Sequence, residues 1–372
     1  LYGIEIDERA AALAAFALTM KARAKQSRFL AKATKTLPNI CHLQPVKFEP
    51  RELEQYMDLQ GKALFTDEIK TLFTQFEEAD NFGSLIRPVE LKNSELRTTL
   101  AEKGIGSHLL LSPVHEDVLR VLGQAEFLQQ RYQVVVANPP YMGGKGMNGR
   151  MAEWAKKNYP DSKSDLFAMF MERGFQCCKD HGLSGMIVME SWMFLSSYQN
   201  LREKFLSDRT IIDLVHMPYM GRGRTPLGIN FGTSASIAYK NYFSGFKGHF
   251  SCIRYFEIDE DSVPLEFPYE NERHKTIVID DFKKIPASPI AYWVSEGIKN
   301  SFSKFKQIKS FADTRIGLIT GDNGKYIRNW AEVSFFKVGL GLTRDAAAIS
   351  VEKWFPQSKG GDFRRWYGNN ET

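Results

Sequence analysis

The chain has 372 residues, of which 43% are hydrophobic and 25% are charged, a composition typical of globular proteins with an ordinary core. Neither a membrane-spanning apolar run nor a signal peptide is evident, so the sequence predicts a cytoplasmic protein without membrane contact. Four cysteines and seven histidines are scattered without metal-ligand spacing, which predicts reduced thiols and no bound metal. The net charge of +5 permits nucleic-acid binding but does not require it.

The first predicted element is a short buried strand over residues 2–6, followed by a helix over residues 10–22 with apolar residues on one face. Glu5 stands at the end of this strand, where nucleotide-binding sheets commonly place a carboxylate that accepts hydrogen bonds from ribose hydroxyls. Ile6 would then pack against an adenine ring. Alternatively, Glu5 and Asp7 only cap the following helix and favour its dipole. We favour this alternative for Asp7 and leave both open for Glu5.

Residues 38–44 form a second predicted strand, and from about 52 to 130 the pattern becomes mostly helical and charged. This segment is too long for a simple crossover between two strands of one sheet. We interpret it as a helical insertion over residues 50–130, and a separate small domain remains equally compatible with the sequence.

A strand over residues 134–137 delivers the turn Asn138-Pro139-Pro140-Tyr141 to its carboxyl end, where open α/β sheets bind their ligands. Few reactions need an Asn-Pro-Pro-aromatic turn at this position. One that does is methyl transfer to the exocyclic amine of a nucleobase. Attack by that amine builds positive charge on nitrogen, which the side-chain oxygen of Asn138 and the carbonyl oxygen of Pro139 can stabilise. The consecutive prolines hold that carbonyl stiffly, and Tyr141 offers a ring face on which an extruded base can stack. The alternative is an ordinary turn, because Asn and Pro are common in turns.

Beyond this turn, helices and strands alternate, which predicts a mostly parallel α/β sheet. Helices are expected over 165–178 and 199–206, and strands over 185–190, 211–216 and 233–239. After about residue 247 the alternation fades and aromatic, basic and glycine-containing stretches follow. We therefore place a domain boundary there, between segments 131–246 and 247–372.

The two signatures Gly-Ile-Glu-Ile-Asp and Val-Val-Ala-Asn-Pro-Pro-Tyr together resemble the methyltransferases that modify adenine N6 in DNA. The resemblance implies a Rossmann-like sheet that binds S-adenosylmethionine through Glu5 and Ile6 and holds a flipped adenine at the catalytic residues Asn138, Pro139, Pro140 and Tyr141. It also implies that Asp165 contacts the cofactor and that Phe231 stacks on the other face of the base. A core position at the start of a strand is the alternative for Phe231.

Further stretches resemble the PglX-type methyltransferases of BREX phage-defence systems, which are related to single-chain restriction–modification methyltransferases. These stretches are residues 138–144, 191–197, 320–323 and 359–369. The resemblance implies duplex DNA and other defence-system proteins as partners, and target recognition over residues 247–372. Lys145 in the glycine-rich loop after the turn, together with Arg364 and Arg365, would contact DNA phosphates. Trp366 and Tyr367, beside these arginines, would stack on bases. A packed aromatic cluster is the alternative, which we favour for Trp366.

The resemblance divides the methyltransferase domain into a partial cofactor-binding half over residues 1–49 and a catalytic half over 131–246. Its first, glycine-rich cofactor motif is not present, and the chain starts with Leu1 inside a strand. We therefore interpret the chain as a fragment that is inactive alone and binds S-adenosylmethionine weakly or not at all. The predicted function is adenine-N6 methylation of duplex DNA for self-marking in defence. Alternatives are methylation of RNA bases or protein glutamine, and a DNA-recognition or assembly subunit.

Overall fold

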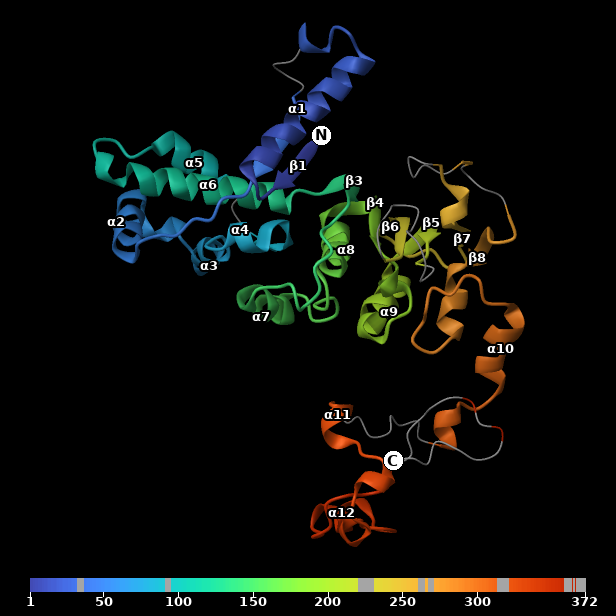
Figure 1. Cartoon of the computed structure of the whole chain (residues 1–372). Coiled ribbons are helices and arrows are strands. Elements are labelled where there is room, and N and C mark those ends of the chain that lie inside the picture. Colours follow the sequence, from blue (N-terminus) through green and yellow to red (C-terminus); the bar gives the residue numbers. More distant parts are fainter. Residues whose placement is uncertain are drawn as a thin grey trace. The chain divides into compact units, whose positions relative to one another are not determined.

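The computed structural model describes residues 1–31, 37–90, 95–219, 231–259, 265–266, 271–312, 321–357, 363 and 365. The chain divides into two compact units, Leu1–Phe305 and Lys306–Thr372, which are described separately. Helices and strands of both units are labelled in Figure 1. In the described ranges, no helix is both long and apolar enough to cross a membrane.

A six-stranded sheet forms the centre of the first unit, with the strand order β3-β4-β6-β5-β7-β8. Its strands are β3 (Tyr132–Ala137), β4 (Cys178–Met189), β5 (Thr210–Met217), β6 (Thr233–Tyr239), β7 (Lys247–Cys252) and β8 (Lys275–Val278). Strands β3, β4, β5 and β7 run in one direction, whereas β6 and β8 run in the opposite direction.

The α/β class predicted from the sequence is confirmed, but the sheet is mixed, not mostly parallel. Strand β6 lies antiparallel between β4 and β5. Parallel neighbours need a long crossover, usually a helix, whereas the sequence between β5 and β6 is short and glycine-rich and predicts no crossover helix. Two strands joined without such a crossover can pair with each other only antiparallel.

Helices α8 (Leu166–Cys177) and α9 (Gln199–Asp208) pack on the same face of this sheet (Figure 1). Their apolar side chains meet buried residues of the strands in one core. Its fully buried members include Phe167, Val188, Trp192, Leu206, Leu214, Phe250 and Phe282. Ala137 and Met189, at the carboxyl ends of β3 and β4, pack against this core.

The chain begins with a separate two-stranded parallel sheet of β1 (Tyr2–Glu5) and β2 (Asn39–His42), connected through α1 (Glu8–Lys25). Helix α1 buries only Ala11. The apolar stripe expected to face a core is open, because Leu13 is 67% exposed and Phe16 is 63% exposed. A groove of about 620 Å³ separates β1 from β3 and has Tyr2, Val134 and Val136 in its lining.

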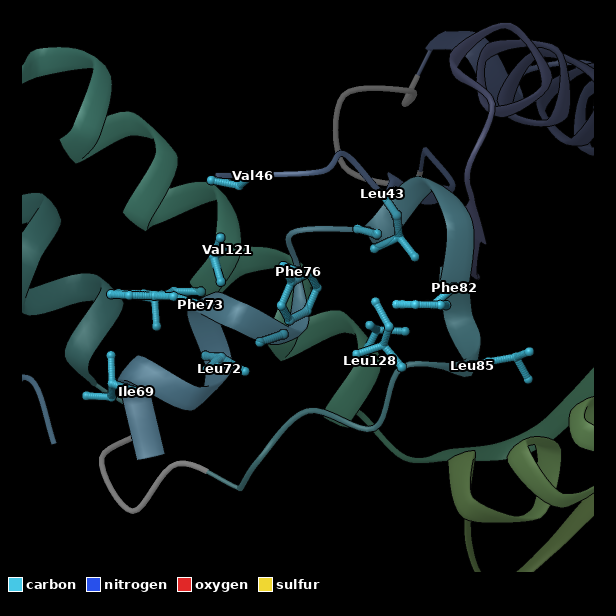
Figure 2. Packing of buried hydrophobic residues seen from close by; sticks show 14 of the residues in the cluster. Leu43, Val46, Ile69, Leu72, Phe73, Phe76, Phe82, Leu85, Val121 and Leu128 are labelled. Atoms are coloured by element: carbon cyan, nitrogen blue, oxygen red, sulfur yellow. The ribbon is translucent and has the colours of Figure 1, made fainter. Parts of the chain in front are cut away.

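Over the described part of residues 50–130, the predicted helical segment contains five α-helices. They are α2 (Pro50–Gln60), α3 (Asp67–Gln75), α4 (Ala79–Phe82), α5 (Leu96–Lys103) and α6 (Ser112–Gln129). Figure 2 shows Ile69, Phe73 and Phe76 packing with Val121 of α6. The same core includes residues before the segment and residues after it, among them Leu43, Val46, Met151, Tyr159 and Met169.

The remaining helices are α7 (Gly149–Asn158), α10 (Glu296–Lys304), α11 (Asn323–Tyr326) and α12 (Arg344–Ala348). Strands β7 and β8 belong to the central sheet, so the boundary predicted near residue 247 falls inside the first unit. The second unit contains α11 and α12, and an isolated bridge pairs Val338 with Trp354.

Candidate functional site

The Asn-Pro-Pro-Tyr corner begins directly after β3, at the edge where the parallel strands β3 and β4 both end. Asn138 and Pro140 are exposed and Pro139 is buried. No hydrogen bond to the carbonyl oxygen of Pro139 occurs within the part of the chain that the structure describes. The corner therefore places a side-chain oxygen and a backbone oxygen without a hydrogen-bond partner among the described residues close together in sequence on a stiff backbone.

Tyr141 ties this corner to β4. Its hydroxyl oxygen lies 3.1 Å from Asn138 Oδ1 and 3.2 Å from the carbonyl oxygen of Ile187. Burial raises the pKa of Tyr141, so the hydroxyl keeps its proton and can donate to either acceptor. An amide oxygen has two lone pairs, so Asn138 Oδ1 can accept a second hydrogen bond while Tyr141 restrains it.

Asp165 anchors the residues that follow the corner. Its Oδ1 accepts hydrogen bonds from the backbone N–H of Met142 at 3.0 Å and of Phe167 at 3.3 Å, and it caps α8. Gly143 forms an isolated bridge with Asp165, and Leu166 N–H donates to the Met142 carbonyl at 3.1 Å. Burial raises the pKa of Asp165, and the backbone hydrogen bonds oppose this shift. The sequence predicted a cofactor contact here and missed this anchoring.

The rings of Tyr141 and Phe231 contact each other edge to face, with centroids 5.2 Å apart and planes at 88°. A base between two rings needs parallel planes separated by roughly 7 Å, twice the contact distance of carbon atoms. The structure thus brings both predicted stacking residues to one place, but Phe231 must move before a base can lie between them. Phe167 packs against the Tyr141 ring as well, at 6.2 Å.

Glu5 and Ile6 lie at the carboxyl end of β1, in the small sheet. Glu5 Oε1 accepts the backbone N–H of Ile6 at 2.8 Å and of Asp7 at 3.1 Å. Asp7 Oδ1 accepts the N–H of Ala10 at 2.8 Å, which confirms the helix cap. Ile6 is 46% exposed, so its side chain is accessible to a ligand.

The predicted DNA contacts are distributed over both units of the chain. Lys145 is exposed in the loop after the corner. Arg365 belongs to the second unit, and Arg364 lies outside the described residues. In the described ranges, no group of three or more His, Cys, Asp or Glu side chains is arranged to hold a metal ion.

Glu190 and His216, near the same edge of the sheet, form a partly buried contact that the sequence did not predict. Glu190 Oε2 lies 2.6 Å from His216 Nε2, and His216 Nδ1 lies 3.0 Å from the hydroxyl of Tyr292. Glu190 follows β4 by one residue, at the same edge as the corner. Its position at the end of a predicted strand was the available signal, whereas its pairing with a residue 26 positions away depends on the strand order.

The family model of the Eco57I restriction-modification methylase matches residues 1–221, which include both β1 and the corner. The chain belongs to this family. An adenine-specific methyltransferase BrxX of Escherichia coli O9:H4 (strain HS) is 36% identical over 395 positions, covering 100% of this chain and 32% of that protein. An adenine-specific methyltransferase PglX of Lacticaseibacillus casei (strain Zhang) is 32% identical, covering 99% of this chain and 31% of that protein. The chain thus spans about a third of the length of these relatives.

Solved structures resemble the chain more distantly. A DrdV–DNA complex aligns with 48% of this chain and 20% of its own, at 14% identity and a TM-score of 0.35. A nuclease-deletion mutant of the restriction-modification enzyme LlaGI, with a DNA substrate mimic, aligns with 50% of this chain and 20% of its own, at 14% identity and a TM-score of 0.35.

Proposed function

We propose that the protein containing this chain transfers a methyl group from S-adenosylmethionine to the N6 amine of adenine in duplex DNA. The observation that carries this proposal is the corner after β3. There, Asn138 Oδ1 keeps a lone pair for a ligand, and the Pro139 carbonyl oxygen has no partner within the described ranges. Family membership and relatives named as adenine-specific methyltransferases support the same chemistry.

The residues at the end of β1 fit the cofactor. Glu5 uses only Oε1 for backbone hydrogen bonds, which leaves Oε2 as an acceptor for ribose hydroxyls, and the exposed Ile6 offers an apolar surface for adenine. When bound, S-adenosylmethionine supplies the electrophilic methyl group. Asp165 would act on this side of the site through its second oxygen, because Oδ1 is committed to backbone N–H groups.

The corner performs three tasks in this proposal. The side-chain oxygen of Asn138 and the carbonyl oxygen of Pro139 accept hydrogen bonds from the two N–H groups of the amine. They stabilise the positive charge that develops on nitrogen. The prolines fix the backbone of the corner, so the two acceptors lose little conformational freedom when the transition state forms. Tyr141 stacks on the extruded base while its hydroxyl restrains Asn138.

The biological role that we propose is self-marking of DNA in a phage-defence system, in the cytoplasm and together with other defence proteins. The relatives named BrxX and PglX support this role, as do the exposed Lys145 and the basic net charge.

The test uses the intact protein with labelled S-adenosylmethionine and three substrates: duplex DNA, RNA and a glutamine-containing peptide. Labelled methyl groups are expected in duplex DNA alone. Digestion of this DNA to nucleosides should release the label as N6-methyl-2′-deoxyadenosine. Long-read mapping of cells with and without the gene should show modified adenines at one sequence. Transfer to RNA or peptide in preference to DNA refutes the proposal.

A further inference from the structure

A carboxylate and an imidazole join two strands of the sheet that are not neighbours. Glu190 directly follows β4, His216 lies in β5, and β6 runs between these two strands. The bond of 2.6 Å between Glu190 Oε2 and His216 Nε2 therefore crosses β6. His216 is buried, and a short bond to a carboxylate in such surroundings is strong.

The bond passes over Gly232, the residue just before β6. A Cβ atom at this position would lie between 2.1 and 2.4 Å from the Glu190 carboxylate atoms, closer than any real side chain allows. The Glu190 backbone N–H also donates to the Gly232 carbonyl at 2.9 Å. Glu190 thus holds residue 232 with its backbone and covers it with its side chain.

The His216 imidazole also contacts Tyr292 and Trp293. His216 Nδ1 lies 3.0 Å from the Tyr292 hydroxyl, and the His216 ring stacks on Trp293 with planes at 25°. Tyr292 stacks in turn on the fully buried Phe250. Burial raises the pKa of Tyr292, so its hydroxyl stays protonated. The ring orientation of His216 is therefore fixed by packing and by both nitrogens.

Phe231 precedes Gly232 in the chain, and its ring contacts Tyr141 at 5.2 Å. We propose that Glu190 and His216 form a clamp across β6 that fixes the backbone at Gly232 and so keeps Phe231 next to Tyr141, while the Phe231 ring turns out of its edge-to-face contact to admit the target base. Both are positioning residues, because they act through Gly232. The clamp rests on the proposed function, since the base that Phe231 meets is the substrate of that reaction.

The experiment compares Glu190→Ala, His216→Ala and Glu190→Gln in the intact protein. His249→Gln is the matched control, because His249 also lies in a strand of this sheet and bonds a hydroxyl, that of Thr276 at 3.3 Å. The two alanine variants should lower kcat/KM for DNA by roughly 100-fold, the size expected for a misplacement of about 1 Å. The Kd for S-adenosylmethionine should not change. Glu190→Gln keeps an acceptor for His216 and should restore most of the activity.

A steric variant and an exchange measurement complete the test. Gly232→Ala should be impaired, and adding Glu190→Ala should make it no slower than Glu190→Ala alone, because the collision needs both side chains. Amide hydrogen exchange of the peptide over residues 231–239 should be faster in both alanine variants than in the wild type or in His249→Gln.

Unimpaired DNA methylation or unchanged exchange in the alanine variants overturns the clamp, as does an equal loss of cofactor affinity and DNA turnover. An intact wild-type protein that methylates no DNA refutes the proposed function, whereas a methylating protein with unimpaired variants refutes only the clamp.

Discussion

Replacing Asn138 with alanine tests the corner most directly. The change removes one of the two oxygens that, in the proposed function, stabilise the developing positive charge, while the Pro139 carbonyl remains. Loss of one preorganised hydrogen-bonding partner in an active site lowers kcat by roughly 100- to 1000-fold, or about 3–4 kcal/mol. We expect a loss of that size in Asn138→Ala.

The same substitution should leave the fold intact. Asn138 is exposed, and the hydroxyl of Tyr141 keeps the Ile187 carbonyl as an acceptor at 3.2 Å when Oδ1 is removed. The free energy of unfolding should therefore change by less than about 1 kcal/mol, the worth of one replaceable hydrogen bond. Asn138→Asp should retain far more activity than Asn138→Ala, because a carboxylate accepts hydrogen bonds in the same geometry.

The assay is single-turnover transfer of labelled methyl groups from S-adenosylmethionine to duplex DNA by the intact protein. Asn200→Ala is the control, because Asn200 is also exposed and bonds Asp161 at 3.3 Å, outside the corner. Wild-type turnover in Asn138→Ala would refute the role of this amide. A loss of activity together with a large decrease in the free energy of unfolding in urea would show that Asn138 acts on the fold instead.

Two further predictions concern the surroundings of the corner, and a third concerns the helical core of Figure 2. Tyr141→Phe keeps the ring face for stacking but removes the hydroxyl that restrains Asn138. The kcat should therefore fall about fivefold, equivalent to ~1 kcal/mol, at an unchanged KM for DNA. Tyr141→Ala also removes the ring and should raise the KM as well. Burial raises the pKa of Asp165, so the folded state binds its proton more tightly than the unfolded state does. Relative to Asp165→Asn, the wild type should therefore gain unfolding free energy as the pH falls through the raised pKa; denaturant titrations at several pH values that show the opposite slope contradict this assignment. Phe76→Ala, at a fully buried position, should lower the free energy of unfolding by about 3–5 kcal/mol in a urea titration, and a loss below ~1 kcal/mol would contradict the packing in Figure 2.

The sequence predicted the elements whose signals are local. The valine run ends as β3 at Ala137, and the corner follows it as expected. Asp7 caps α1 because a short carboxylate before a helix reaches the N–H three residues ahead.

Features that depend on strand order were out of reach of the sequence. The antiparallel placement of β6 is decided by which strands pair, and the contact between Glu190 and His216 follows from that placement. The anchoring role of Asp165 arises from the fold that brings Met142 beside the start of α8. Likewise, the apolar stripe of α1 indicated a helix correctly but not what covers it.

The groove between the two sheets has a consequence for handling the isolated chain. Strand β3 is the first in the sheet order, and Val134 and Val136 are 56% and 78% exposed beside its outer edge. Unshielded strand edges with β-branched side chains template intermolecular pairing, and nearby charges such as Arg131 and Lys179 oppose it. When salt screens these charges, concentrated preparations of this chain alone should form fibrous or oligomeric species through β3, and a lysine substituted for Val136 should keep them dispersed.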